Sequence, residues 1–163
     1  MIVIQLNEKV TRPPGVIFVP YAPDHSTYIN SHNKDVQAIS NVTSLQGMVE
    51  DQAAAGEAIT VLHHDIPVAV FGLVPIWKGL AEFWFIPDEA VRRFPMFMFR
   101  ASRAFIDISA ISYDLHRQQI TVRCDDEKAI RFAYLVGFNN EGRLEKYGPD
   151  QADFFMMSIV RTE

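Results

Sequence analysis

The sequence of 163 residues has a single cysteine, no apolar run long enough to cross a bilayer, and no surplus of positive charge. One cysteine cannot form an internal disulfide or supply a cysteine-based zinc cluster, which favours a reducing compartment. A membrane helix needs about 20 mostly apolar residues. The first ten residues also lack the basic start and apolar run of a signal peptide. We therefore expect a cytoplasmic protein with no membrane partner.

The charge balance is acidic, with 15 basic against 20 acidic residues and a net charge of −5. A phosphate backbone would therefore meet no overall positive field, and we expect no nucleic-acid partner. Aromatic residues make up 12% of the chain and hydrophobic residues 48%, which excludes disorder over most of the length. The composition and length predict one domain spanning residues 1–163.

The middle of the chain has the pattern of a three-stranded meander. Residues 57–64, 68–76 and 80–86 are rich in β-branched and aromatic side chains and are separated by short turns. The second segment is apolar almost throughout, which predicts the centre of the sheet. Four shorter segments are also predicted as strands: 16–19, 119–124, 143–147 and 153–160.

Helical periodicity predicts a long helix over residues 95–115, with Pro95 in its first turn. A shorter helix is expected over 45–55, with Ser44 as its N-cap and Gly56 as a left-handed C-terminal cap. The polar run 24–44 before it is predicted to be an irregular helical segment.

The segment from Asp126 to Phe138 predicts a further helix, because Asp126 can cap its start and Gly137 suits a left-handed end. This segment resembles the GNAT superfamily of acyl-CoA-dependent N-acyltransferases. In that family a helix beginning near Asn-x-x-Ala and ending in Gly-Phe leads into a strand, and here Ala129, Gly137 and Phe138 fall in register. The order of predicted elements matches the family over roughly the whole chain. The overall pattern is also similar to the GNAT-like proteins of tailed phages, including internal virion proteins.

The resemblance implies an α+β fold, GNAT-like, with a mixed and mostly antiparallel sheet of about seven strands flanked by about four helices. It also implies that two neighbouring strands diverge after Trp84 and leave a notch for the pantetheine arm of acetyl-CoA or a related acyl-CoA, the cosubstrate. The backbone groups of Phe85 and Ile86 are the candidates for holding that arm. The alternative is that this stretch is plain sheet edge or core.

The family's phosphate-binding loop is altered, since residues 88–98 contain no glycine. Glycines let backbone N–H groups approach a pyrophosphate closely. Arg92 and Arg93 are the candidates for replacing that cradle with guanidinium groups, although they are alternatively a solvated pair that balances neighbouring acids. Asp126 stands where the family usually has asparagine, which puts a carboxylate at this cofactor-binding position.

Two residues are candidates for catalysis. Glu82 is a carboxylate within an otherwise apolar run and is the best candidate for a general base, unless it faces solvent on an alternating strand. The tyrosine that often protonates the departing thiolate in the family aligns with Ala133, so Tyr134 is one residue, or about 100° around the helix, out of place. Tyr134 is the candidate acid; its alternative role is an ordinary surface or core aromatic.

No metal site is expected, because the sequence has no metal-ligand spacing. The adjacent histidines His63 and His64 fall on a predicted strand, where their side chains are expected to point to opposite faces.

Two functions from different classes follow from the resemblance. The first is an N-acyltransferase that transfers an acyl group, acetyl being the expected one, from acyl-CoA to an amine, with an amine on a protein as one option. The alternative is a non-catalytic GNAT-fold phage protein that acts as a virion component or binds a host protein. If the chain is phage-encoded, it is expected in the host cytoplasm or the virion.

Overall fold

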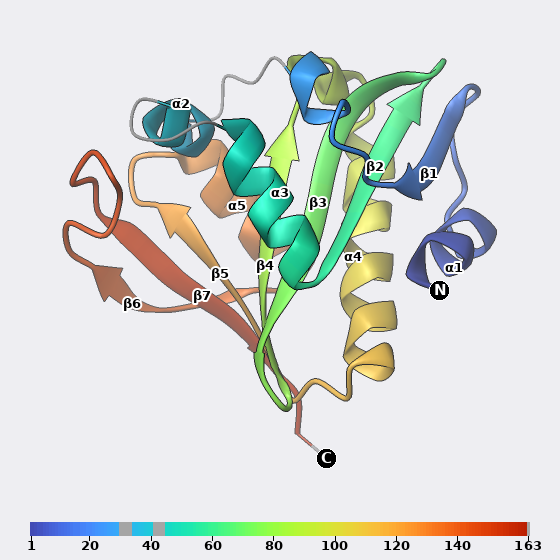
Figure 1. Ribbon diagram of the computed structural model, residues 1–163. Helices are drawn as coiled ribbons and strands as arrows, with labels where there is room; N and C mark the ends of the chain where they lie inside the picture. Colours follow the sequence, from blue (N-terminus) through green and yellow to red (C-terminus); the bar gives the residue numbers. More distant parts are fainter. Residues whose placement is uncertain (30–33, 41–44, 163) are drawn as a thin grey trace.

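The computed structural model describes residues 1–29, 34–40 and 45–162, and in this part of the chain seven strands form one sheet. The strand order is β1-β2-β3-β4-β5-β7-β6, as Figure 1 shows. All neighbours run antiparallel except β4 and β5, which are parallel. The strands are β1 Val16–Pro20, β2 Glu57–His63, β3 Ile66–Trp77, β4 Leu80–Pro87, β5 Arg117–Arg123, β6 Asn139–Leu144 and β7 Phe154–Val160.

The helices cover both faces of the sheet. The described helices are α1 Ile2–Lys9, α2 Lys34–Ser40, α3 Leu45–Ala55, α4 Pro95–Ser112 and α5 Glu127–Val136, with 3-10 turns η1 Ser26–Tyr28 and η2 Glu89–Arg93. Helices α1, α4 and α5 pack on one face, and α3 crosses the other face over β2 and β3 (Figure 1). The predicted α+β fold, mostly antiparallel, is therefore confirmed.

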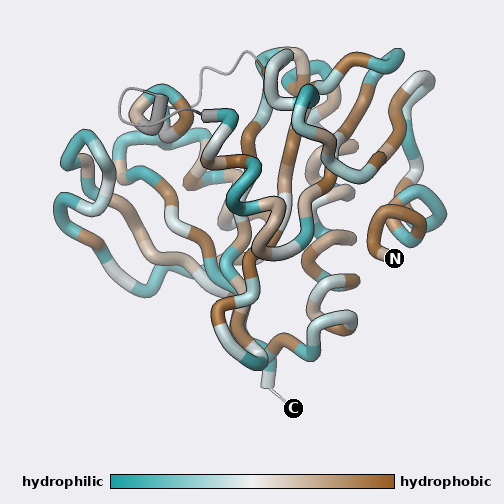
Figure 2. Tube along the Cα trace, in the orientation of Figure 1, coloured by the Kyte–Doolittle hydropathy of each residue, from teal (hydrophilic) through white to brown (hydrophobic). Residues whose placement is uncertain are grey.

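Strand alternation divides the core between the two faces. Phe71 of β3 belongs to the large cluster formed with α1, α4 and α5, whereas its neighbour Val70 packs with Val36 of α2 and Val49 of α3. A strand covered on both faces must be apolar at every position, which explains the nearly continuous apolar sequence of β3. Figure 2 shows this as long hydrophobic stretches in the middle of the sheet.

The sheet opens between its two central strands. Over their described lengths, β4 and β5 pair only through Leu80 with Arg117, Ala81 with Gln118 and Glu82 with Gln119. Beyond Glu82, β4 continues to Pro87 with β3 as its partner, while β5 continues to Arg123 with β7 as its partner. The strands therefore diverge, two residues earlier than the sequence predicted, and one side of β4 is left without a neighbouring strand.

Most predicted elements are present, but several details of the prediction are wrong. Residues 2–9 form α1, which was not predicted; Asn7 docks it by donating to the carbonyl oxygen of Phe18 at 2.8 Å and accepting from the Phe18 N–H at 3.0 Å. The predicted strand 143–147 begins earlier, at Asn139. The helix predicted over 95–115 ends at Ser112.

The prediction that Gly56 is a left-handed C-terminal cap is wrong. Gly56 does not have a positive φ, so it is not a left-handed cap. A Cβ built on Gly56 would lie 2.0 Å from the carbonyl oxygen of Leu73, so glycine is needed there because β3 approaches the chain so closely. Ser44, the predicted N-cap of α3, lies outside the described residues, as does part of the segment 24–44.

No helix in the described ranges is long and apolar enough to cross a membrane.

Candidate functional site

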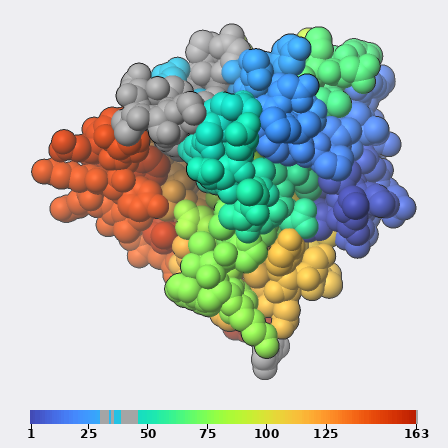
Figure 3. All heavy atoms as spheres, viewed as in Figure 1, coloured from blue at the N-terminus to red at the C-terminus, as the bar shows by residue number. Residues whose placement is uncertain are grey.

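A cavity of about 1240 Å³ fills the space between the diverging strands. Its walls come from the open half of β4, the loop with η2, the first turns of α4, the middle of β5 and one face of α5. Residues of α2 and α3 line it from the opposite face of the sheet. In the space-filling view, α3 and the β3–β4 hairpin cover the middle of that face, and the β6–β7 arm stands beside them (Figure 3).

The α4 and α5 side of the cavity is aromatic. Phe83 and Phe85 point to this side, where Phe83 contacts Phe105 and Phe85 stacks on Phe132 with ring centroids 6.4 Å apart. Phe85 and Ile86, the residues predicted to hold the pantetheine arm, both line the cavity. The cavity therefore combines an apolar wall with the unpaired backbone side of β4, where main-chain groups are available to a ligand.

Glu82 lies at the point where β4 and β5 diverge, called the vertex below, because it belongs to the last residue pair that joins the two strands. Its Oε2 accepts a hydrogen bond from Nε2 of Gln119 at 3.3 Å, and its half-buried side chain lines the cavity. Residues two apart on a strand share a face, so Glu82 points to the same side as Trp84, toward α3. A carboxylate at this vertex can accept a proton from a group held between the strands.

Two polar atoms are buried on the α3 side of the cavity. They are Nε1 of Trp84 and Oε1 of Gln52, and neither has a hydrogen-bond partner within the described chain. Both residues line the cavity. A donor and an acceptor are therefore available beside Glu82 to a polar group that enters from this side.

The loop between β4 and α4 separates two residues that were predicted to act together. Arg92 lines the cavity, but Arg93 does not; it lines a separate hollow on the far side of the first turn of α4. The loop forms η2, whose start is capped by Oδ1 of Asp88, which accepts from the N–H of Ala90 at 2.8 Å. A 3-10 turn thus occupies the place where the resemblance implied a glycine-rich loop, and four residues from this loop line the cavity: Asp88, Glu89, Val91 and Arg92.

Asp126 has a structural role at the start of α5. Its Oδ1 accepts from the N–H of Ala129 at 3.1 Å, which caps the helix. Asp126 also lines the cavity, so it places a negative charge at this end of α5. Lys128, two residues later in the first turn of α5, lines the cavity too and supplies a positive charge there.

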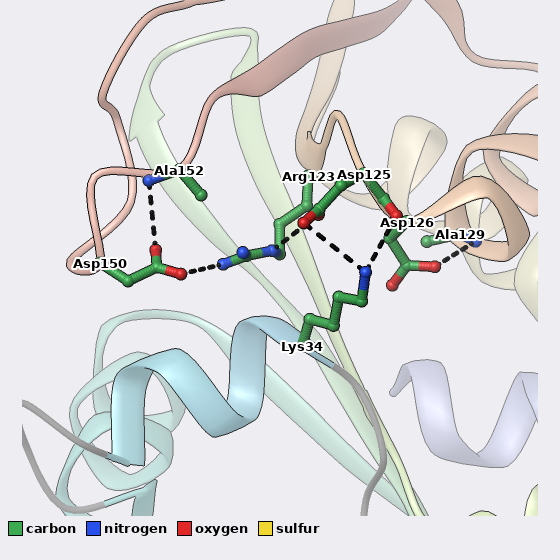
Figure 4. A network of polar contacts seen from close by, with 7 residues as sticks. All are labelled: Lys34, Arg123, Asp125, Asp126, Ala129, Asp150 and Ala152. Carbon is green, nitrogen blue, oxygen red and sulfur yellow. Dashed lines mark hydrogen bonds and ion pairs between the residues drawn. The ribbon is translucent and has the colours of Figure 1, made fainter.

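A polar network ties three segments together at the rim (Figure 4). Nζ of Lys34, on α2, donates to the carbonyl oxygen of Asp125 at 3.1 Å. The buried Arg123 contacts Asp125 at 3.1 Å and Asp150, in the β6–β7 loop, at 2.9 Å. Hydrogen bonds from Arg123 lower the pKa of both carboxyl groups, so both stay ionised well into the acid range.

Tyr134 lies apart from the cavity. Its side chain is 49% exposed and does not line the cavity, whereas Ala133 lines it and is only 4% exposed. Ala133, and not Tyr134, therefore occupies the cavity-facing position on α5. The structure does not bring Tyr134 together with Glu82.

Several cavity residues were not predicted. Lys34, Gln52, Gln119 and Lys128 are polar residues on four different elements, and only the folded chain brings them to one cavity or beside it. The i,i+4 spacing of Met48 and Gln52 on one helix face was a usable signal for Gln52, because residues four apart share a face. No comparable signal marked Lys34.

The prediction that the side chains of His63 and His64 point to opposite faces of a strand is wrong. His64 falls in the turn after β2 with φ 47°, and the two rings lie 4.3 Å apart instead of pointing to opposite faces. Within the described ranges, no group of three or more His, Cys, Asp or Glu side chains is placed to hold a metal ion.

Comparison with known proteins gives similarity in structure only. No protein-family model matches the chain, and no curated protein matches it in sequence. Ard1 from Thermoplasma volcanium superposes with a TM-score of 0.75 and 18% identity, over 91% of this chain and 99% of that one. A GNAT-family acetyltransferase from Bacillus anthracis superposes with a TM-score of 0.71 and 14% sequence identity, over 91% of this chain and 96% of that one. RimL, a ribosomal L7/L12 alpha-N-protein acetyltransferase in complex with coenzyme A, superposes with a TM-score of 0.67 and 16% sequence identity. The match covers 93% of this chain and 97% of that one. The chain therefore has the fold of the GNAT acetyltransferases.

Proposed function

We propose that the protein is an N-acyltransferase that transfers an acyl group, most simply acetyl, from acyl-CoA to an amine. The observation that carries this proposal is the unpaired side of β4 beyond Glu82, which faces a cavity of about 1240 Å³. An extended ligand with amide groups can pair with such a strand edge as an added strand would. The pantetheine arm of CoA is a ligand of this kind, and the aromatic wall formed by Phe83 and Phe85 suits its apolar parts.

The charges around the cavity fit the phosphates of CoA in part. Lys34, Arg92 and Lys128 line it, and a guanidinium group can bind a phosphate through two parallel hydrogen bonds. Asp88, Glu89 and Asp126 line it as well and oppose an anion. Arg92 stands on the loop that precedes α4 and is the residue that we expect to contribute most to phosphate affinity.

When bound, acyl-CoA supplies an activated thioester whose carbonyl carbon can be attacked by an amine. Glu82 at the vertex takes the proton that the amine loses, either directly or through one water, and Gln119 holds the carboxylate in place. The new C–N bond forms as the C–S bond breaks, and the sulfur leaves as a thiolate that takes its proton from solvent. Ala133 cannot supply that proton.

The amine approaches from the α3 side, where Trp84, Gln52 and Glu82 face the cavity. The buried donor on Trp84 and acceptor on Gln52 match a polar group next to the amine, such as an amide or hydroxyl. RimL, one of the similar structures, acts on the α-amine of a ribosomal protein. A protein amine is therefore one candidate acceptor for this chain.

Isothermal titration calorimetry with acetyl-CoA tests the proposal. We expect a dissociation constant no weaker than the high-micromolar range, and a loss of about tenfold or more in Arg92→Gln, because one charge-assisted hydrogen bond is worth about 1.5–3 kcal/mol. Arg131→Gln is the matched control, because Arg131 pairs with Glu127 on the outer face of α5 and does not line the cavity. No heat and no thermal shift at millimolar acetyl-CoA would refute the proposal.

The non-catalytic alternative, a phage virion component or host-protein binder, stays a prediction. The glycine-free loop favours it, and the open cavity with a carboxylate at its vertex favours the enzyme.

A further inference from the structure

A second, smaller hollow lies on the other side of the first turn of α4. It has a volume of about 440 Å³ and is formed by the segment before β1, the end of η2 and one face of α4. Three arginines from these three segments line it, together with apolar residues and one threonine. The lining residues are Thr11, Arg12, Pro13, Arg93, Phe94, Pro95, Met96, Phe97 and Arg100.

None of the described residues that line this hollow is acidic. Arg12 donates from Nη1 to the carbonyl oxygen of Val16 at 3.1 Å, and Arg93 donates from Nε to the carbonyl oxygen of Ala90 at 3.4 Å. Each of these two groups keeps further N–H donors, since a guanidinium has five. Like charges gathered without a carboxylate repel one another, and a bound anion would relieve that repulsion.

The surroundings of the hollow add to its positive character. Helix α4 begins beside the hollow, with Pro95 in its first turn and without a side-chain cap, so the positive end of the helix dipole lies next to it. The acids of the preceding loop, Asp88 and Glu89, line the large cavity instead.

His63 lies beside the hollow. Its ring lies 4.9 Å from that of Phe94, which lines the hollow. Its pKa is lowered by desolvation first, and then by electrostatic interactions with His64 and Arg93.

We propose that this hollow binds a phosphate group, held by the guanidinium groups of Arg93 and Arg100 with Arg12 at the rim. The planar fork of arginine matches the oxygens of a phosphate and can bind two of them at once. Pro95 and Met96 line both the hollow and the large cavity, so the two spaces adjoin across one helical turn.

Two sources can supply the phosphate. One is the 3′-phosphate of a CoA molecule whose pantetheine arm lies along β4, and this source rests on the proposed function. The other is a phosphate monoester on a separate molecule.

Titration with inorganic phosphate, at constant ionic strength kept with chloride, tests the site without CoA. In amide NMR spectra of the whole protein we expect saturable shifts at Met96 and Phe97. The shifts should be lost in the double variant Arg93→Gln/Arg100→Gln and kept in Arg131→Gln, which removes a charge outside both spaces. The single variant Arg100→Gln should weaken phosphate binding by at least about threefold. No saturable shift in the wild type, or equal shifts in the double variant, would overturn the proposal.

Calorimetry with CoA and with dephospho-CoA then identifies the source. If the 3′-phosphate occupies the hollow, CoA should bind about tenfold more tightly than dephospho-CoA, and the preference should vanish in the double variant. Equal affinities, with phosphate still bound at Met96 and Phe97, would assign the hollow to a separate phosphorylated ligand. If neither CoA form binds but phosphate does, the proposed function fails and the phosphate site stands. A CoA preference that survives in the double variant would exclude the 3′-phosphate from the hollow.

Discussion

Replacing Glu82 by glutamine removes the proposed base and changes little else. The amide of glutamine has nearly the same shape as the carboxylate, and its oxygen can still accept the hydrogen bond that Gln119 donates at 3.3 Å. The pairing of Glu82 with Gln119, which closes the vertex, is a backbone feature and is kept. The structure therefore predicts a folded variant with an intact cavity.

The expected effect lies in the chemical step. A positioned general base contributes about 10²–10⁴-fold to a rate, and water can reach this half-buried vertex, so we expect the lower end, a loss of about 10²-fold in turnover. This corresponds to about 2.7 kcal/mol in the activation free energy. The affinity for acetyl-CoA should be unchanged, because no part of the pantetheine or phosphate site is altered.

The assay is release of free CoA thiol from acetyl-CoA, first with a panel of primary amines and peptide N-termini to find the fastest acceptor. Glu8→Gln, the same chemical change on the exposed side of α1, is the control and should keep full activity. An unchanged turnover in Glu82→Gln would remove Glu82 from the mechanism. A loss of acetyl-CoA affinity in the calorimeter would show instead that Glu82 supports the cavity.

Two further predictions concern stability. Gly137→Ala should lower the free energy of unfolding by about 1–3 kcal/mol in urea denaturation, because Gly137 has φ 119° and an added Cβ would lie 2.7 Å from Nη1 of Arg103. The control is Gly142→Ala, because no atom lies within 4 Å of a Cβ built on Gly142. Equal losses of stability in the two variants would contradict this reasoning. Arg123 lowers the folded-state pKa of Asp125 and Asp150, so its stabilisation is present above their unfolded pKa of about 3.9 and is lost as pH falls through the folded values. Arg123→Gln should therefore be less stable than the wild type at pH 7 and lose less stability between pH 7 and pH 3; parallel pH curves would contradict this.

The sequence predicted the elements whose signals are local. The meander follows from β-branched and aromatic runs, and α5 follows from Asp126 as N-cap and Gly137 as C-cap, both of which the structure confirms. Helix α1 was missed because its stability depends on burying Ile2 and Leu6 in the core shared with α4, and eight residues are too short for a clear periodic signal.

The sequence singled out Glu82 as a carboxylate within an apolar run, and Phe85 and Ile86 through the family resemblance. Glu82 and Phe85 fall on opposite faces of β4 and both line the cavity, while their roles toward a ligand stay predictions. Arg92 and Arg93 could not be separated by sequence, because adjacent residues in a 3-10 turn point about 120° apart and the direction of the turn is set by tertiary packing. Lys34 and Asp125 are 91 residues apart in the chain, and only the fold brings them together.

Hydrogen exchange of the β4 backbone, with and without acetyl-CoA, tests the central claim most directly. Among residues 83–86, the amides that face away from β3 have no partner strand, so we expect them to exchange rapidly in the free protein and to become protected when acetyl-CoA is added. The amides of β3 at Ala69 and Val70, which lie inside the sheet and do not line the cavity, should not change and serve as the internal control. Exchange along β4 that is slow without ligand, or that saturating acetyl-CoA leaves unaltered, would contradict the account.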